Sequence, residues 1–353
     1  MNELYAVYFQ PEDWLAFREN RRFNPGDSVK SVFPSPFPFY GAIRTALLKK
    51  YNVKLFYHKK PELSQELLEK IGDENNPGLI KLYGPFLYSE ENGIKKHYFP
   101  APKNIYIYEH DSNKTEYKIM QYFDTEIKFE DLQLGLAWIP EYDNVQEIGE
   151  NYIELQELVN LQSEKEFVLS NPENFEIESR LGIALEKSYK KSKEGMIYTM
   201  TIYRFKNGGF FMLTDSRETV EELSKIDFVF LGSKQRWCNV KIESFPYNVF
   251  QKIQSENVAI ELITPAIYEN GITPKEAKFG EIRIKAVAAN KKMAISGWDY
   301  TSGKPKPMHQ AVSPGTVYYL DKVPENDEVI TNQSLYNQFG FGRFVYIPYK
   351  PFE

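Results

Sequence analysis

PSPFPFYGAIRTALLKKY, residues 34–51, is the stretch that best predicts how the first part of this chain folds. Three prolines at alternate positions fix φ and favour an extended lead-in, and Pro38 is tolerated in the first turn of a helix. From Ile43 the apolar residues recur at i, i+3 and i+4, which predicts a helix with one buried face. Gly41 costs roughly 1 kcal/mol of helix propensity relative to alanine. It is explained if another backbone or a ligand comes close there.

Arg44 follows the start of this helix by about one turn. A small residue and a cation near a helix N-terminus are typical of a phosphate-binding site. An ordinary core helix with a proline-stiffened entry explains the same pattern. The stretch alone leaves both interpretations open.

The composition indicates a globular protein with a large stock of flat side chains. The 353 residues include 25 Tyr and 25 Phe, and 42% are hydrophobic and 26% charged, which predicts about two domains. Cys238 is the single cysteine, which excludes an internal disulfide, and four scattered histidines form no zinc-ligand pattern. We therefore expect no metal and no cofactor. The sequence shows no signal peptide and no apolar run of membrane-spanning length, so we also expect a cytoplasmic protein with no membrane partner.

The net charge of −6 argues against a stand-alone, non-specific nucleic-acid binder, but the charges are segregated along the chain. Residues 1–60 contain ten Lys or Arg against five Asp or Glu, whereas residues 109–180 contain eighteen acids against five bases. This pattern predicts a basic surface and a separate acidic insertion. Solvated helix faces would explain the acidic stretch equally well.

Three glycine-rich or basic segments are candidate RNA contacts, because single-stranded RNA is held by flat side chains and by phosphate donors. They are the loop at 17–23, the loop at 297–309 and the segment at 338–347. A surface loop, a bulge or a tight turn explains each of them as well. With the helix start, the candidate residues are Arg18, Arg21, Arg22, Arg44, Lys304, Lys306, His309, Gly340, Gly342 and Arg343.

The order of elements predicts an α+β fold. A strand at residues 4–9, a loop and the helix of residues 38–51 are the opening of a β-α-β-β-α-β unit. Asn207-Gly-Gly209 is a hairpin signal, and strand patterns continue to the C-terminus. Between them, residues 105–174 are acidic and contain a predicted helix at 151–168, which we interpret as an insertion that docks on a partner.

Taken together, motifs spread over nearly the whole chain resemble the third subunit of the Cmr complex, the type III-B CRISPR effector built from RAMP proteins. The order of the motifs carries the resemblance rather than any one of them. They are Gln10-Pro-Glu-Asp13, Phe17-Arg-Glu-Asn-Arg21, Pro34-Ser-Pro36, Tyr40 to Leu47, Phe99-Pro-Ala-Pro102, Leu181-Gly-Ile183, Glu194 to Tyr198, Leu231-Gly-Ser-Lys-Gln-Arg236, Gly297-Trp-Asp299, Lys304-Pro-Lys-Pro307, Ala311 to Tyr319 and Phe339-Gly-Phe-Gly-Arg343. The chain departs from the pattern at Ser233-Lys234, where a second glycine and an acid are more usual, and its glycine-rich loop is short.

The resemblance implies two ferredoxin-like (RRM-type, RAMP) lobes with insertions, at 1–104 and 180–353, separated by the acidic insertion at 105–179. It also implies a non-catalytic subunit that holds the 5′ repeat-derived handle of the CRISPR RNA. Such subunits dock on the large polymerase/cyclase-type subunit and belong with the backbone RAMP subunits. On this basis we expect the candidate residues to form one cleft for the handle.

Two alternatives remain at this point. A metal-independent RAMP endoribonuclease would need general acids and bases, and His58, His97, His110 and His309 are available but far apart in sequence. A pure protein scaffold would use the acidic insertion and make no RNA contact. Salt-dependent RNA binding distinguishes the scaffold from the RNA-binding subunit.

Overall fold

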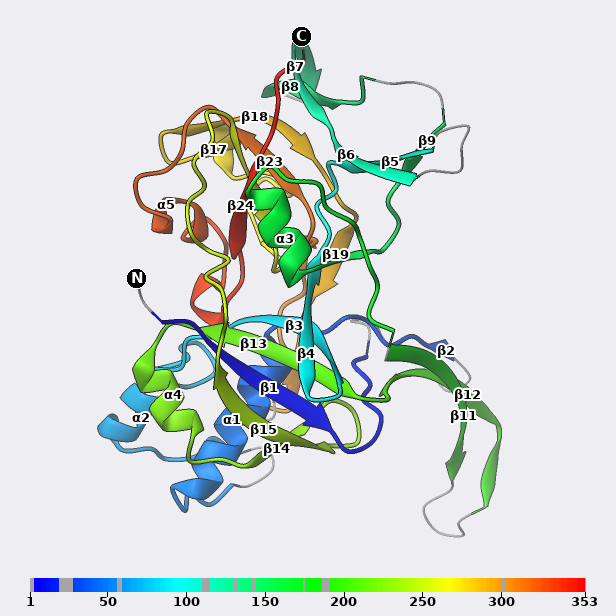
Figure 1. The fold of residues 1–353 in the computed structure, drawn as a ribbon. Helices are drawn as coiled ribbons and strands as arrows, with labels where there is room; N and C mark the ends of the chain where they lie inside the picture. The colour runs from blue at the N-terminus through cyan, green and yellow to red at the C-terminus, as the bar shows by residue number, and fades with distance from the viewer. Residues whose placement is uncertain are drawn as a thin grey trace.

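The structure is a computed structural model. It describes residues 3–18, 28–55, 59–109, 115–129, 132–140, 144–173, 175–185, 191–299 and 302–352. Within these ranges the chain is a mixture of helix and strand, with mostly antiparallel sheets and few helices (Figure 1). The expected α+β class is confirmed at this level.

A seven-stranded antiparallel sheet forms the larger unit. Its order is β10(Tyr152–Glu154), β4(Ile94–Pro100), β3(Tyr83–Glu91), β13(Gly208–Thr214), β1(Tyr5–Pro11), β15(Arg236–Ser244) and β14(Phe228–Leu231). Because side chains alternate along a strand, β1 buries Val7 and Phe9 on one face and Ala6 and Tyr8 on the other. Both faces of this central strand are therefore covered.

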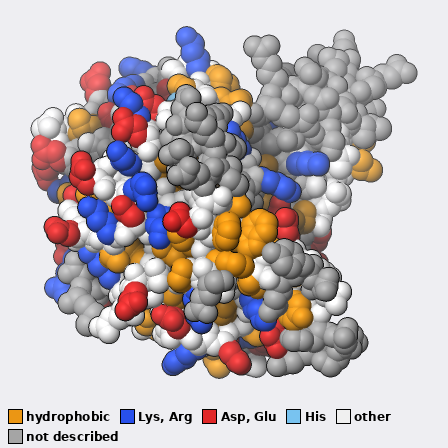
Figure 2. Space-filling model, turned by 90° about the horizontal axis from the view of Figure 1, so that it is seen from above, with side chains coloured by type: hydrophobic (Ala, Val, Ile, Leu, Met, Phe, Trp, Pro, Cys, Tyr) orange, Lys and Arg blue, Asp and Glu red, His pale blue; other side chains and the backbone are white. Residues whose placement is uncertain are grey.

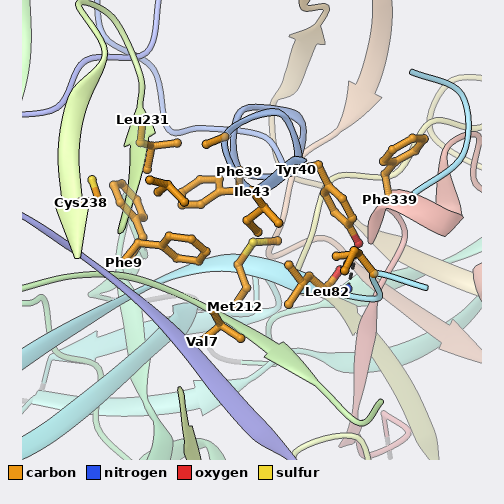
Figure 3. Close-up of a cluster of buried hydrophobic side chains, with 14 of the residues drawn as sticks. Val7, Phe9, Phe39, Tyr40, Ile43, Leu82, Met212, Leu231, Cys238 and Phe339 are labelled. Atoms are coloured by element: carbon orange, nitrogen blue, oxygen red, sulfur yellow. Dashed lines mark hydrogen bonds between the residues drawn. The ribbon is translucent and has the colours of Figure 1, made fainter. Parts of the chain in front are cut away.

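Three helices cover the face of the sheet that contains Val7: α1(Phe37–Lys50), α2(Gln65–Ile71) and α4(Arg217–Leu223) (Figure 1). The predicted helix is confirmed as α1. It has proline in its first turn and two lysines in its last, where cations offset the negative end of the helix dipole. Its buried face, with Phe39 and Ile43, packs on Phe9, Met212 and Leu231 of the sheet (Figure 3).

A five-stranded antiparallel sheet forms the second unit, in the order β17(Lys278–Phe279), β18(Ile282–Ala288), β23(Val317–Leu320), β16(Val258–Leu262) and β24(Phe344–Pro348). One of its faces joins the second face of the larger sheet and α3(Leu155–Gln162) in a single hydrophobic cluster. The short elements around it are η1(Lys275–Ala277), α5(Glu328–Thr331) and η2(Asn337–Phe339).

The two sheets share one strand order. In chain order, β1, β3, β13 and β15 lie as β3-β13-β1-β15, and β16, β18, β23 and β24 lie as β18-β23-β16-β24. In both sheets the second and third strands lie on one side of the first, and the fourth lies on the other. The first sheet has α1 and α4 in the connections after its first and third strands, whereas the corresponding connections of the second sheet contain η1, α5 and η2.

The larger sheet crosses the predicted boundary at residue 180. Strands β13, β14 and β15 come from residues 208–244, yet they pair with β1 and with one another. The predicted hairpin at Asn207-Gly-Gly209 is wrong, because β12(Ser192–Phe205) and β13 belong to different sheets. The two glycines are explained by close packing: a Cβ at Gly208 or Gly209 would collide with a carbonyl oxygen of Tyr88 or Phe9, respectively.

The predicted acidic insertion is largely strand. The predicted helix at 151–168 is shorter than expected, since β10 occupies 152–154 and α3 ends at Gln162. The rest forms a small sheet of β5(Ile105–Glu109), β6(Thr115–Ile119) and β9(Val145–Glu147), and the ribbon of β7(Gln121–Phe129) and β8(Leu132–Trp138). Isoleucine and tyrosine alternate along β5 at residues 105–108, a period of two that fits a strand better than a helix.

Three further sheets complete the described chain. A long hairpin of β11(Phe175–Leu185) and β12 projects from the larger unit, and β12 also pairs with β2(Ser28–Val29) (Figure 1). Two short ribbons, β19(Lys292–Ile295) with β22(His309–Val312) and β20(Trp298–Asp299) with β21(Lys304–Pro305), arise from the second half of the chain.

Candidate nucleic-acid interface

A groove of about 1520 Å³ runs alongside α1 and contains three of the predicted site residues, Arg18, Arg44 and Lys306. We call it the α1 groove. Its walls come from α1, from the loop after α2, from the turn between β14 and β15, and from the two short ribbons. Segments far apart in the sequence are thus brought together. The other charged residues that line it are Lys49, Lys50, Lys59, Asp73, Glu74, Lys225, Asp227 and Asp299.

Arg44 is held by α1 against the end of α2. Its Nε donates a hydrogen bond of 3.1 Å to the Gly72 carbonyl oxygen. Burial lowers the pKa of the Arg44 guanidinium, and the carboxylates of Glu74 and Asp73 oppose this shift without cancelling it. The positive charge is therefore only partly compensated by the protein, so a phosphate in the groove would lower the free energy of this cation.

Lys306 reaches the same region from the ribbon side. Its Nζ lies 3.3 Å from the Glu74 carbonyl oxygen and 4.7 Å from the centre of the Phe37 ring. Burial also lowers the pKa of the Lys306 ammonium, opposed by nearby carboxylates. Two under-compensated cations, one from each half of the chain, thus face the loop of residues 72–75.

Gly41 lies on the exposed side of α1 and lines the groove. A Cβ built at this position would meet no protein atom within 4 Å. A close approach of another backbone, one of the two explanations for this glycine, is therefore wrong for the described structure. An approaching ligand remains as the explanation that the packing leaves open.

Exposed aromatic side chains line the same groove. Phe228 and Phe230 on β14 and Trp298 on β20 are each between 37% and 50% exposed, which is enough for a flat partner to stack on them. Lys49 Nζ lies 5.4 Å from the centre of the Phe230 ring. The interface thus offers both cations and flat faces, the combination that single-stranded RNA requires.

Five of the predicted residues lie outside the groove lining. Lys304 is exposed on β21, next to Pro305, which does line the groove. His309 Nε2 lies 3.4 Å from the Tyr336 hydroxyl. The guanidinium of Arg343 lies 4.1 Å from the centre of the Tyr83 ring, where β24 meets β3 of the other sheet. The remaining two, Gly340 and Gly342, are buried.

The two buried glycines are explained by protein packing. Both have positive φ, of 83° and 71°, and a Cβ at Gly340 would collide with the Leu82 carbonyl oxygen, while one at Gly342 would lie 2.6 Å from the Ser334 Cβ. Glycine is needed there for the left-handed backbone and the close contact. An RNA contact at these positions stays a prediction that the packing does not favour.

Several predicted residues lie outside the described ranges, namely Arg21, Arg22, His58 and His110. Of the histidines within them, His97 is buried, its Nε2 lies 2.7 Å from the Tyr8 hydroxyl, and burial lowers its pKa to about 4. Where the structure describes the chain, His, Cys, Asp and Glu form no group of three that could hold a metal ion. None of the described helices is long and apolar enough to cross a membrane.

Sequence reasoning missed the aromatic side of the groove. Phe228 and Phe230 alternate with the buried Val229 and Leu231 along β14, so the strand pattern itself indicated two outward aromatic side chains. Lys225 Nζ lies 2.6 Å from the carboxylate of Glu222, three residues earlier, and 2.8 Å from the Tyr51 hydroxyl at the end of α1. The local ion pair gives no sign of the groove, and the contact with α1 comes from a distant part of the chain.

The segregation of charge along the sequence does not produce a surface of one sign on the face drawn in Figure 2. There, Lys and Arg side chains are interspersed with Asp and Glu, and hydrophobic side chains gather between them.

A family model of CRISPR-associated proteins matches residues 7–348. The chain belongs to this family, the CRISPR-associated protein family Cas_Cmr3. The resemblance to the third subunit of the Cmr complex is thereby confirmed. No curated protein matches the chain.

Two solved structures show a related fold. One is a chain of the type III-B Cmr-beta complex bound to cognate target RNA, with 18% identity and a TM-score of 0.52, covering 97% of this chain and 96% of that one. The other is a chain of the same kind of complex bound to cognate target RNA and AMPPnP, with 19% identity and a TM-score of 0.50, covering 89% and 86%. At these identities the likeness is one of fold.

Proposed function

We propose that this chain is a non-catalytic RNA-binding subunit of a type III-B CRISPR (Cmr) effector complex, and that the α1 groove holds the 5′ repeat-derived handle of the CRISPR RNA. Family membership supports the place in a Cmr complex. The proposed partners are the CRISPR RNA, the large polymerase/cyclase-type subunit and the backbone RAMP subunits, in the cytoplasm. The shared strand order of the two sheets supports the proposal of two ferredoxin-like lobes.

The observation that carries the RNA contact is the α1 groove beside Gly41. Arg18, Arg44 and Lys306 line it, and Gly41 leaves its floor open for a close approach. A phosphate in the groove would lower the free energy of the partly buried charges of Arg44 and Lys306, and the bases would stack on the exposed aromatic rings. Arg21 and Arg22 follow Arg18 in the sequence and are proposed to extend this contact.

The test fills the groove without harming the fold. Gly41→Leu projects a side chain into open space and replaces a poor helix former by a good one. The free energy of unfolding should therefore stay equal or rise by up to about 1 kcal/mol. RNA binding should weaken roughly tenfold, the cost of forcing a methylene-rich side chain into a filled site. Gln65→Leu is the matched control, because Gln65 is neutral, exposed and on α2, outside the groove lining.

Binding is measured by fluorescence anisotropy with the full chain, alone and together with the large Cmr subunit, on handle RNA and on a scrambled RNA at two salt concentrations. The proposal expects preference for the handle, and a log–log salt slope of about −0.7 for each phosphate contact. A second variant, Arg18→Ala with Arg21→Ala and Arg22→Ala, should lower both affinity and slope. Binding to the large Cmr subunit without any preference for handle RNA would support the scaffold role instead. Equal affinity of Gly41→Leu and Gln65→Leu for the handle RNA would refute an RNA contact in the α1 groove.

A further inference from the structure

A second cavity, of about 290 Å³, lies where the β11–β12 hairpin leaves the larger unit. We call it the hairpin-root pocket. Three cations line it, Arg180, Lys234 and Arg236, together with the aromatic side chains of Trp14 and Tyr198. Its size is at the lower end of small-ligand sites, roughly 300–1,000 Å³, which suits one nucleotide rather than a stretch of chain.

Trp14 and Arg236 form a flat stack in this pocket. The guanidinium carbon of Arg236 lies 3.8 Å from the centre of the Trp14 ring, and that of Arg180 lies 5.6 Å from it. Trp14 is 5% exposed, whereas the Arg236 side chain is 31% exposed. The tryptophan is therefore the buried support, and the guanidinium plane is the surface on which a base can stack.

The polar groups of the pocket are incompletely satisfied. Arg236 Nη1 lies 3.3 Å from the Asp13 carboxylate, but its buried Nε has no hydrogen-bond partner among the described residues. Arg180 Nη2 lies 3.7 Å from the Glu178 carboxylate. Lys234 has no ion-pair partner within the described part of the chain. Glu178 also accepts two hydrogen bonds from Arg204. The three cations of the pocket and Arg204 therefore share two carboxylates, which leaves a local excess of positive charge for an anion.

The backbone at Lys234 is held in an unfavourable conformation. Lys234 and Gln235 have φ of 65° and 49°, in the left-handed region that residues with a side chain seldom adopt. The turn is fixed by the Ser233 amide, which donates a 2.8 Å hydrogen bond to the Ala16 carbonyl oxygen. The turn thus presents the Lys234 side chain at the pocket and persists because the segment of residues 14–18 supports it.

The hairpin-root pocket and the α1 groove lie on the two sides of one ridge. The ridge consists of the β14–β15 turn and the segment of residues 14–18. Gly232, Ser233 and Gln235 line the groove, whereas Lys234 and Arg236 line the pocket. In the same way, Arg18 lines the groove and Trp14 the pocket. A strand that leaves the groove across this turn therefore reaches the pocket directly.

We propose that the hairpin-root pocket binds one nucleotide of the single-stranded RNA that occupies the α1 groove. The base stacks on the Arg236 guanidinium, and its flanking phosphates contact Lys234 and Arg180. The inference rests on the proposed function, because the same strand must fill the groove. The proposed pocket would therefore be a second RNA contact, for a nucleotide adjacent to the part of the strand held in the α1 groove.

The experiment compares handle RNA with handle RNAs extended by single-stranded uridines at either end, using the full chain and fluorescence anisotropy. Arg180→Gln with Lys234→Asn removes two cations, and asparagine tolerates the left-handed backbone. Lys241→Ala is the control, since Lys241 is exposed on β15 and lines neither cavity. The double variant should lose the affinity gained by one extension, and its salt slope should fall by about 1.4, at about 0.7 for each phosphate.

Arg236→Lys tests the stack separately, because it keeps the charge and removes the plane. Its salt slope should stay as in the unaltered chain, while binding of the extended RNA weakens roughly fivefold, the lower end of one base-stacking contact. A 5-iodouridine in the extension should cross-link to the peptide that contains Tyr198 or Trp14, located by mass spectrometry. Cross-links confined to the groove would overturn the inference.

The failures are distinguishable. If the double variant bound every RNA as tightly as the unaltered chain, while Gly41→Leu still bound more weakly, the proposal for the hairpin-root pocket would be overturned and the proposed function would stand. No RNA binding by the unaltered chain in the presence of the large subunit would overturn both.

Discussion

Glu261 makes the free energy of unfolding depend on pH in a direction opposite to that of most carboxylates. It lies in β16, between Val317 of β23 and Val345 of β24, and is fully buried. Neither carboxylate oxygen has a hydrogen-bond partner among the described residues. Burial raises the pKa of Glu261 well above 4.5, and the positive charge of Lys103 opposes the shift only partly.

The sign follows from proton binding. The folded chain holds the Glu261 proton at pH values where the unfolded chain has released it, so folding takes up a proton. The stabilising protonation is fully present below about pH 4.5 and is lost as the pH rises through the folded-state pKa. Above about pH 4.5, each unit of pH therefore lowers the free energy of unfolding by up to about 1.4 kcal/mol through this one group.

Glu261→Gln removes the titration and keeps the shape. Its free energy of unfolding should exceed that of the unaltered chain by an amount that grows with pH, by up to about 1.4 kcal/mol for each pH unit between 4.5 and the folded-state pKa of Glu261. Urea unfolding followed by circular dichroism at several pH values measures the difference. Glu281→Gln, at an exposed position before β18, is the control and should leave the pH profile unchanged. Parallel profiles for Glu261→Gln and the unaltered chain would refute the reasoning.

Three further changes test the contacts that hold the two sheets and α1 together. Tyr40→Phe should lower the free energy of unfolding by about 1–3 kcal/mol in urea titration, because the Tyr40 hydroxyl accepts from the Leu82 amide at 2.8 Å and donates to its carbonyl at 3.1 Å, and both would be left unpaired. Gly340→Ala should lower the thermal midpoint, since the new Cβ would collide with the Leu82 carbonyl oxygen at a φ of 83°, whereas Gly93→Ala meets only open space. Burial lowers the pKa of His97 from 6.5 to about 4. The free energy of unfolding should therefore fall by up to about 3 kcal/mol as the pH drops from 6.5 to 4. His97→Gln should reduce this loss when both forms are compared by urea titration in the Glu261→Gln background.

The local elements were largely predictable from the sequence. Residues 34–51 carry enough proline chemistry and helical periodicity to fix α1, and the alternation at residues 4–9 fixed β1. The sheet partners were not predictable in the same way. Strand β13 pairs with β1, about two hundred residues earlier, because their apolar faces fit one core, and no turn signal encodes such a pairing. Asn207-Gly-Gly209 illustrates this limit, because the sequence alone does not distinguish glycines needed for close packing from glycines needed for a turn.

The candidate site was predictable only in part. Arg18 and Arg44 were recognised from basic and helix-start patterns, but the same reasoning selected Gly340 and Gly342. Both glycines are buried, Gly340 against Leu82 and Gly342 against Ser334. Cations and glycines have both structural and ligand-binding uses, and only the burial of each residue in the fold distinguishes the two uses. Gly41 and Gly340 illustrate the point: a Cβ would find open space at the first and a carbonyl oxygen at the second.

Both halves of the chain contribute cations to the α1 groove, and this links the proposed RNA binding to folding. Arg44 comes from α1 on the first sheet, whereas Lys306 comes from the ribbons of the second half, and both hydrogen-bond carbonyl oxygens of the 72–74 loop. Neither half alone would present the two cations at one place. A phosphate that bridges them would therefore stabilise the contact between the halves as well as bind, because a ligand that binds only the assembled form shifts the folding equilibrium toward it.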